Sequence, residues 1–396
     1  MKALSFEGSG FEYFKIWIVN VLLTIVTLGL YYPWAKVRNH RYFYANSTLE
    51  GRNFEYHATG KQLFIGYLIA MALFIAYVVI QQVSPEGSLI VLLILFLALP
   101  WIIWRSMKFN MRMSSFSNVR FGFMGKLGGS YMTFLVFPFI LFLAFYGPII
   151  ALTMLPFISL MYPNMPWLAV ALPIFALALF IFAFYMYALV KKKSATYTIA
   201  GSRYGQGQFV TELETKKFLM ILLKTFGVSI LVFASLVMAI AVVASATIGL
   251  DGLKEAMGTM KDPNVMKGGG ILPIVLFAIA YLGLILAMMF IMAYSITRYR
   301  KYVYANTTLD EKITFSSTLK AMPLAWVMVS NFLAVIFTLG LALPWAKVRL
   351  ARLFLENTHV GSDVGFDEYV TQKQKEGSAL GDQIGDAFDV DVGLGF

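Results

Sequence analysis

The sequence of 396 residues predicts an all-α integral membrane protein, a multi-pass helical bundle with short cytoplasmic β-hairpins between its helices. Three observations lead to this fold class. Hydrophobic residues make up 59% of the chain and charged residues only 13%, whereas a soluble domain carries about 25% charged residues. The apolar residues are gathered in long runs, and basic residues are concentrated in alternate loops between those runs.

Eight apolar runs are candidates for membrane-spanning helices, because about 20 mostly apolar residues cross a hydrocarbon core of roughly 30 Å. A spanning segment must satisfy its own backbone hydrogen bonds, as a helix does, and the runs lack the alternating polarity of barrel strands. We expect six to eight true spans among them. The runs are residues 13–34, 63–83, 88–104, 130–155, 167–190, 219–250, 271–297 and 323–345.

The basic residues behind the net charge of +11 at pH 7 are concentrated in alternate loops rather than spread evenly along the chain. Four loops together hold 21 lysines and arginines, and the alternate connections hold three. By the positive-inside rule the four basic loops are cytoplasmic. This sidedness explains the positive charge without a nucleic-acid partner. The basic loops are residues 35–62, 105–129, 191–218 and 298–322.

Short motifs recur along the chain and predict an internal repeat. TLGLYYPWAKVR at 27–38 and TLGLALPWAKVR at 338–349 match at a constant spacing of 311 residues. After each basic cluster, residues rich in Ser and Thr lead through a polar or glycine-containing turn to an aromatic residue, which is typical of a hairpin. We therefore expect one polytopic domain, residues 1–366, built of five units: 1–60, 61–129, 130–217, 218–321 and 322–366.

The two matching motifs conflict with eight simple crossings, which would place Arg38 and Arg349 on opposite faces of the membrane. We expect segment 323–345 to enter and leave on the same side, and segment 13–34 to do likewise. Such broken helices are tolerated where protein or water surrounds the backbone. Six true spans and a cytoplasmic C-terminus would follow. The outer units would then carry one apolar helix each and the middle three units two.

Three segments near the N-terminus resemble a known family. They are EYFKIWIVN at 12–20, TLGLYYPWAKVR at 27–38 and RYFYANSTLEG at 41–51. Together they resemble the YjgN-type family of bacterial inner-membrane proteins, and the resemblance extends over roughly residues 5–366. It implies a location in the bacterial inner membrane. The family has no assigned function, so the resemblance implies no substrate, catalytic residue or cofactor.

Four arginines near the PWAKVR motifs are candidate ligand-binding residues: Arg38, Arg41, Arg349 and Arg352. A tryptophan followed by basic residues is the usual anatomy of a cytoplasmic helix end, which favours a structural role. The alternative is a site for an anionic lipid headgroup or phosphate, because guanidinium groups bind phosphate through two hydrogen bonds. That alternative requires the two ends of the chain to pack together.

Three polar side chains within the apolar runs are further candidate ligand-binding residues: Asn20, Asn331 and Lys224. Asparagine in a bilayer usually forms hydrogen bonds across a helix interface. The alternative is a ligand for a substrate or ion, because transporter sites occur in broken helices. Lys224 lies near the cytoplasmic end of its run, so its side chain either extends to the interface or serves a buried function.

Motifs for catalysis are absent from the sequence, and we expect no enzyme activity. The chain has no cysteine, which excludes thiolate chemistry and cysteine-based metal sites. Walker, HExxH and GxSxG motifs are also absent. We therefore assign no catalytic residue, no metal and no cofactor. The glycine- and aspartate-rich tail, residues 367–396, is expected to be acidic and disordered.

Two functions remain open. The first is a transporter or permease for a lipid or an anionic solute, indicated by the repeat, the broken helices and the basic cytoplasmic side. The second is a non-transporting scaffold or regulator, in which exposed strand edges of the cytoplasmic hairpins recruit a partner by strand addition. The expected partners are the lipid bilayer and anionic headgroups, and a protein partner or a homo-oligomer stays open.

Overall fold

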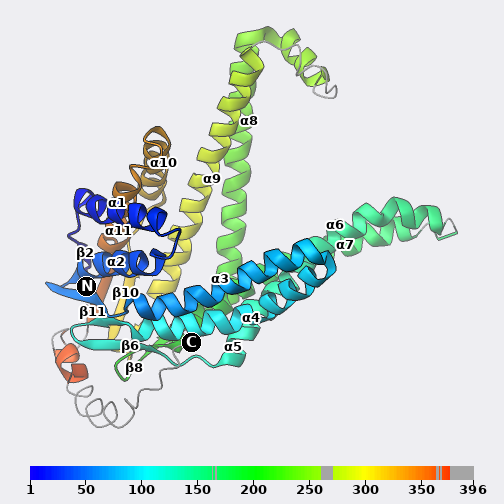
Figure 1. Cartoon of the computed structure of the whole chain (residues 1–396). Helices are drawn as coiled ribbons and strands as arrows, with labels where there is room; N and C mark the ends of the chain where they lie inside the picture. The colour runs from blue at the N-terminus through cyan, green and yellow to red at the C-terminus, as the bar shows by residue number, and fades with distance from the viewer. Residues whose placement is uncertain (163, 166, 260–270, 363–364, 366–367, 375–396) are drawn as a thin grey trace.

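The fold consists of long helices that project from one end of the molecule, where the strands gather (Figure 1). The computed structural model describes residues 1–162, 164–165, 167–259, 271–362, 365 and 368–374. In this view the longest pair of helices points away from the other long helices, and the N-terminus lies at the strands.

Within the described residues, six helices are long and apolar enough to cross a membrane. In each, at most 17% of the most apolar stretch is buried inside the protein. A helix that is apolar on all sides and so little covered by protein requires an apolar solvent, which fits a multi-pass membrane protein. The six comprise α3 (Gly60–Val83), α4 (Pro85–Arg112), α5 (Leu127–Tyr131) with the π-helical turn η1 (Met132–Val136) and α6 (Phe137–Met161), α7 (Leu168–Gly201), α8 (Thr215–Thr259) and α9 (Ile271–Ala305).

The first and last apolar runs each form the first helix and the turn of a short helical hairpin. One hairpin consists of α1 (Gly10–Val26) and α2 (Tyr32–Ala45), and the other of α10 (Ala321–Phe337) and α11 (Leu343–Glu356). In each outer unit the first helix is apolar, and the second, α2 or α11, carries the basic PWAKVR motif; one apolar helix in each outer unit stays a prediction. The return of these segments to the side of the membrane from which they start stays a prediction, and the chain reversal near the end of each run supports it.

The recurring TLGL sequence forms the turn of both hairpins. The threonine hydroxyl, as at Thr27, donates to a carbonyl four residues earlier and accepts from an amide four residues later. The next two residues adopt positive φ, 50° and 91° at Leu28 and Gly29, and 49° and 93° at Leu339 and Gly340. Glycine takes such angles freely, and a proline in the first turn then starts α2 and α11. The motif is thus explained by turn geometry.

The strands form one sheet whose order is β1-β11-β10-β9-β8-β7-β6-β5-β4-β3-β2. The all-α class is therefore incomplete, because the expected hairpins are joined to one another. The strands are β1 (Lys2–Ala3), β2 (Ser5–Phe6), β3 (Ser47–Leu49), β4 (Arg52–Tyr56), β5 (Ser114–Phe116), β6 (Val119–Phe123), β7 (Ser202–Tyr204), β8 (Gly207–Thr211), β9 (Thr307–Leu309), β10 (Ile313–Ser317) and β11 (Thr358–Ser362).

The two ends of this sheet are consecutive pieces of the same N-terminal segment, separated by Leu4 alone. β1 pairs with β11, and β2 pairs with β3. The amide of Leu4 itself donates to the carbonyl of Thr358 at 2.9 Å. The N-terminal segment therefore closes the sheet into a ring, which we call the strand ring.

Neighbouring hairpins of the strand ring pair in one common register. In each pairing, the central residue of the second strand of one hairpin lies opposite the third residue of the first strand of the next hairpin. Division of the chain into five repeat units stays a prediction, and this common register supports it. The pairs are Phe54 with Phe116, Phe121 with Tyr204, Phe209 with Leu309, and Phe315 with Val360.

The helices also form a closed circle of neighbours. Each helix packs on the next along the chain, from α1 to α11, and α11 packs back on α1. At this closure Tyr13 and Val348 are buried together with Phe6. The two ends of the helical part therefore pack together, as the arginine hypothesis requires.

The beginning of the C-terminal tail is ordered. Residues 368–374 form a short helix, and Tyr369 and Val370 are 2% and 0% exposed. This differs from the expectation of a disordered tail, because two large apolar side chains find a place in the strand ring. Residues 375–396 lie outside the described residues.

Candidate ligand cavity in the strand ring

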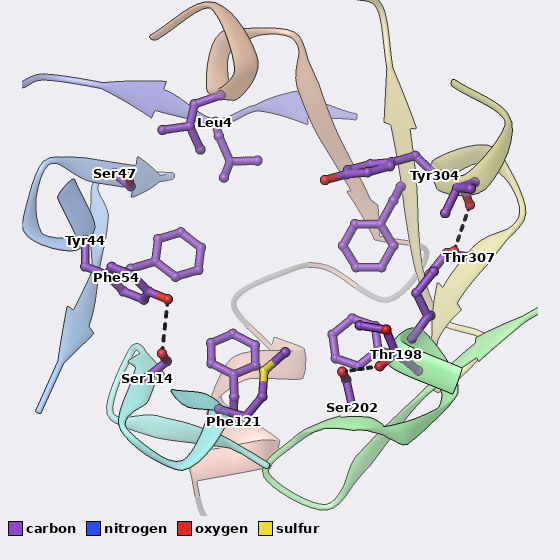
Figure 2. Close-up of a pocket in the computed structure, with 16 residues that line it drawn as sticks. Leu4, Tyr44, Ser47, Phe54, Ser114, Phe121, Thr198, Ser202, Tyr304 and Thr307 are labelled. Atoms are coloured by element: carbon purple, nitrogen blue, oxygen red, sulfur yellow. Dashed lines mark hydrogen bonds between the residues drawn. The ribbon is translucent and has the colours of Figure 1, made fainter. Parts of the chain in front are cut away.

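A cavity of about 520 Å³ lies inside the strand ring (Figure 2). Ligand cavities in proteins usually measure about 300–1,000 Å³. None of its lining residues is acidic, basic or histidine. The lining residues are Leu4, Tyr44, Ser47, Phe54, Met111, Ser114, Phe121, Thr198, Ile199, Ser202, Phe209, Val303, Tyr304, Thr307, Phe315 and Leu355. All of them except Thr198 and Val303 fall into three layers that repeat around the ring.

The first layer is aromatic and comes from the centres of the second strands. Phe54, Phe121, Phe209 and Phe315 occupy the same position in β4, β6, β8 and β10, and Leu4 holds the corresponding place in the N-terminal segment. The rings of Phe209 and Phe315 stack with centroids 5.9 Å apart. Figure 2 shows the labelled side chains of this layer directed toward the centre of the ring.

The second layer consists of hydroxyl groups at the first residue of each first strand. Each hydroxyl donates to the backbone carbonyl four residues earlier, over 2.7–2.8 Å, and so caps the preceding helix. A hydroxyl has a single proton to donate, so these groups offer only lone pairs to a ligand. The five residues are Ser47, Ser114, Ser202, Thr307 and Thr358, of which the first four line the cavity.

The third layer comes from the ends of the helices that lead into the strands. Its members lie three residues before the hydroxyl residues: Tyr44, Met111, Ile199, Tyr304 and Leu355. Three of them are wholly apolar, and the tyrosines add aromatic rings. The cavity therefore suits an uncharged, apolar group and lacks ligands for a metal ion.

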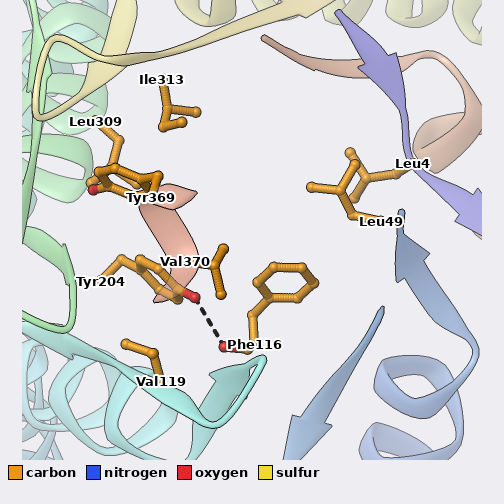
Figure 3. Close-up of a cluster of buried hydrophobic side chains, with 9 residues drawn as sticks. All are labelled: Leu4, Leu49, Phe116, Val119, Tyr204, Leu309, Ile313, Tyr369 and Val370. Atoms are coloured by element: carbon orange, nitrogen blue, oxygen red, sulfur yellow. Dashed lines mark hydrogen bonds between the residues drawn. The ribbon is translucent and has the colours of Figure 1, made fainter. Parts of the chain in front are cut away.

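A buried cluster closes the cavity on the side away from the helices (Figure 3). The aromatic layer packs against this cluster. Two of its members, Tyr369 and Val370, come from the C-terminal helix and lie between strand residues. The hydroxyl of Tyr204 donates to the carbonyl of Phe116 at 3.0 Å and ties neighbouring hairpins together. The strand ring is thus not open through its centre.

Polar contacts hold the C-terminal helix in this position. Asp310 accepts hydrogen bonds from the hydroxyl of Tyr369 at 2.9 Å and from the amide of Gln208 at 2.8 Å, and its carboxylate lies 3.0 Å from Nζ of Lys373. Partial burial acts to raise the pKa of Asp310, but the hydrogen bonds from Gln208, Lys373 and Tyr369 outweigh it and lower the pKa below its usual value. Asp310 is therefore a charged anchor for this helix.

The candidate asparagines lie inside the two short helical hairpins, not in the cavity. Asn20 is 3% exposed, and its Oδ1 accepts from Arg38 at 3.3 Å while its Nδ2 donates to Asn39 at 3.2 Å. Asn331 accepts from Arg349 at 3.0 Å and donates to a backbone carbonyl of α11. Each asparagine joins the two helices of its own hairpin.

The other two arginines contact loops. Arg41 donates to the carbonyl of Ala58 at 2.8 Å, and Arg352 donates to that of Gly8 at 3.0 Å. Although the chain ends pack together, the four candidate arginines thus have four different partners. Lys224 is exposed on α8 and is not part of the cavity lining.

Sequence reasoning did not find the cavity residues, although their signal was present. The Ser or Thr after each helix and the aromatic residue after each turn were noted only as marks of a hairpin. Their recurrence at one position of every hairpin is the feature that places them in layers. A closed ring was needed to see that all of them face one space.

Comparison with known proteins identifies similar sequences. The family model described as "Bacterial protein of unknown function (DUF898)" matches residues 1–387. An inner membrane protein YjgN of Salmonella typhimurium is 28% identical over 392 residues, covering 95% of this chain and 93% of the relative. The YjgN protein of Escherichia coli O157:H7 is 37% identical over 127 residues, 31% of each chain. No solved structure matches this chain.

Proposed function

This chain belongs to the bacterial protein family of unknown function DUF898, and from that premise we propose that it is a non-enzymatic inner-membrane permease for lipids. In this function the strand ring takes up the acyl chain of a membrane amphiphile. The observation that carries the proposal is the uncharged, largely apolar cavity at the ends of the membrane helices.

The chemistry of the lining favours a lipid over a small anionic solute. A free anion in the cavity would lose its hydration, and the lining has no cation to replace it. An acyl chain loses no hydrogen bonds on entering the same space. The layered phenyl, hydroxyl and helix-end side chains would surround such a chain on all sides.

The proposed location is the bacterial inner membrane, with the strand ring on the cytoplasmic side. The names of the relatives and the six apolar helices support the membrane. The excess of lysine and arginine at the strand end of the helices supports the side. The cavity would then adjoin the cytoplasmic leaflet, where a lipid chain could enter between helix ends.

The alternative function, a scaffold, was based on exposed strand edges, and the strand ring does not provide them. Partner recruitment by strand addition requires a free strand edge. The N-terminal segment pairs with both β11 and β3, so the described strands leave no long edge open. A regulator that binds a partner by other means stays a prediction, without a structural feature in its support.

Binding of radiolabelled hexadecanol to the purified, full-length protein in detergent tests the proposal. Ile199→Trp adds bulk to the helix-end layer and should abolish saturable binding. Val210→Trp places the same side chain on the exposed face of β8 and should leave binding unchanged. Equal melting temperatures for the two variants would show that both fold. Full binding by Ile199→Trp would contradict the proposal.

A further inference from the structure

An arginine that has no carboxylate partner in the part of the chain that the structure describes lies next to the cavity. Nη2 of Arg300, on α9, donates to the carbonyl of Phe354 at 3.2 Å and to the hydroxyl of Thr358. Its guanidinium group lies 4.4 Å from the ring centroid of Tyr304 and 5.1 Å from that of Phe354. Nε of Arg300 is buried and has no hydrogen-bond partner among the described residues.

This arrangement leaves a positive charge incompletely satisfied. The structure gives Arg300 no ion pair within the described part of the chain, and its contacts are neutral carbonyl, hydroxyl and aromatic groups. A half-buried charge is costly unless an opposite charge or a full set of hydrogen bonds compensates it. A buried donor without a partner calls for an explanation, and an anion bound at this position provides one.

The position of Arg300 relative to the cavity indicates what kind of anion would bind. Tyr304, one helical turn later on α9, lines the cavity, as does Leu355, which follows Phe354. Arg300 is therefore at the helix side of the cavity, near the end of the apolar span Ala278–Ala305. Lipid headgroups lie at this level of a membrane-spanning helix. A ligand with its chain in the cavity would have its head beside Arg300.

The energetics of transfer from a bilayer point to the same place. Hydrocarbon tails are as apolar as the cavity lining, so a chain that moves from the bilayer into the cavity gains little free energy from burial. The hydroxyl layer has already used its donors on backbone carbonyls. Affinity and selectivity must therefore come from polar contacts at the head of the ligand.

We propose that Arg300 binds the anionic head, a carboxylate or a phosphate, of a single-chain amphiphile whose chain occupies the strand-ring cavity. The volume of about 520 Å³ lies in the lower half of the usual range and suits one chain rather than two. The planar guanidinium group can offer Nε together with an Nη to two oxygens of one head. This inference rests on the proposed function and names its class of substrate.

The test compares three probes with identical chains and different heads: hexadecanoate, hexadecyl phosphate and hexadecanol. The intact protein in a neutral detergent should bind both anions more tightly than the alcohol. Arg300→Gln and Arg300→Met should weaken anion binding about tenfold or more, because charge-assisted hydrogen bonds are lost. Binding of hexadecanol should change less than twofold. Arg298→Gln removes an exposed charge two residues away and should change none of the three.

Two further comparisons separate the role of the charge from that of the guanidinium geometry, and a carboxylate head from a phosphate head. Arg300→Lys keeps the charge without the planar fork, and should retain part of the preference for anions. The anion that loses more affinity in Arg300→Gln identifies the head, carboxylate or phosphate. The inference is overturned if neutral variants bind the anions as the wild type does, or if they lose all three probes equally. If Ile199→Trp binds hexadecanol normally, the cavity itself is not the chain site, and the proposed function fails instead.

Discussion

Arg349 on α11 donates a hydrogen bond of 3.0 Å to Oδ1 of Asn331 on α10. The pair joins the two helices of the last hairpin at positions inside both helices. Arg38 and Asn20 form the same pair in the first hairpin, at 3.3 Å. The candidate ligand residues therefore form the same asparagine–arginine hydrogen bond in both hairpins. This recurrence favours a structural role for both asparagines.

Replacement of Asn20 by alanine tests this structural role. The substitution removes the hydrogen bonds that the buried Asn20 side chain forms with Arg38 and Asn39, and should lower the free energy of unfolding by about 1–2 kcal/mol. Asn331→Ala should cost less, because Asn331 is more exposed. Thermal unfolding in detergent measures both, with Lys224→Gln as a neutral control. An unchanged melting temperature for Asn20→Ala would indicate that the asparagine is kept for ligand binding.

A glycine at the start of α3 allows a tryptophan to pack closely. A Cβ atom at Gly60 would lie 2.2 Å from Cδ1 of Trp34, and the same relationship holds between Gly10 and Trp345. Gly60→Ala should therefore destabilise the protein by at least about 1 kcal/mol, as overpacking usually does. Gly66→Ala on the same helix meets nothing within 4 Å and should be neutral or slightly stabilising. Equal melting temperatures for the two variants would contradict the packing argument.

Much of the helical part could be predicted because its signal is local. An apolar run of about 20 residues specifies a span without knowledge of the rest of the chain. The breaks in the first and last runs were harder to place, because the TLGL turn puts Leu28 and Leu339 at positive φ. Leucine is rare in this region, so composition alone did not mark the turn.

The closure of the strand ring could not be predicted from local patterns. Each hairpin was visible, but pairing between hairpins joins residues as distant as Phe6 and Ser47, or Ala3 and His359. The closing segment is only residues 2–6, which is too short for a strand signal. The C-terminal helix was missed for a similar reason, because Tyr369 and Val370 are outweighed by the polar composition around them.

Removal of residues 2–6 should open the strand ring. β3 and β11 would each lose a partner strand, and free strand edges promote association between molecules. We expect the truncated protein to form larger assemblies than the full chain in size-exclusion chromatography. Lys2→Gln, which removes the charge that pairs with Glu50 but keeps the backbone of the segment, should elute as the wild type. A truncated protein of unchanged size and stability would mean that the N-terminal segment does not close the ring.

The anchoring of the C-terminal helix by Asp310 gives a test that benefits from the absence of native cysteine. Val370→Cys provides a single thiol at a fully buried position, and it should react slowly with a thiol reagent at neutral pH. Adding Asp310→Asn removes the charge that holds Lys373, so the thiol should react at least about tenfold faster. Glu311→Gln, next to Asp310 in sequence, is the matched control.

The pH dependence of the same contact follows from the lowered pKa of Asp310. A carboxyl group with a lower pKa in the folded protein contributes stability above its unfolded pKa, about 3.9. This contribution is lost as the pH falls through the folded value. Hydrogen exchange of residues 368–374, corrected for intrinsic rates, should therefore show protection at pH values above about 4 and release in more acid solution. In Asp310→Asn the protection should be weak throughout and should lack this transition. A transition of the wild-type size in the variant would assign the pH dependence to another group.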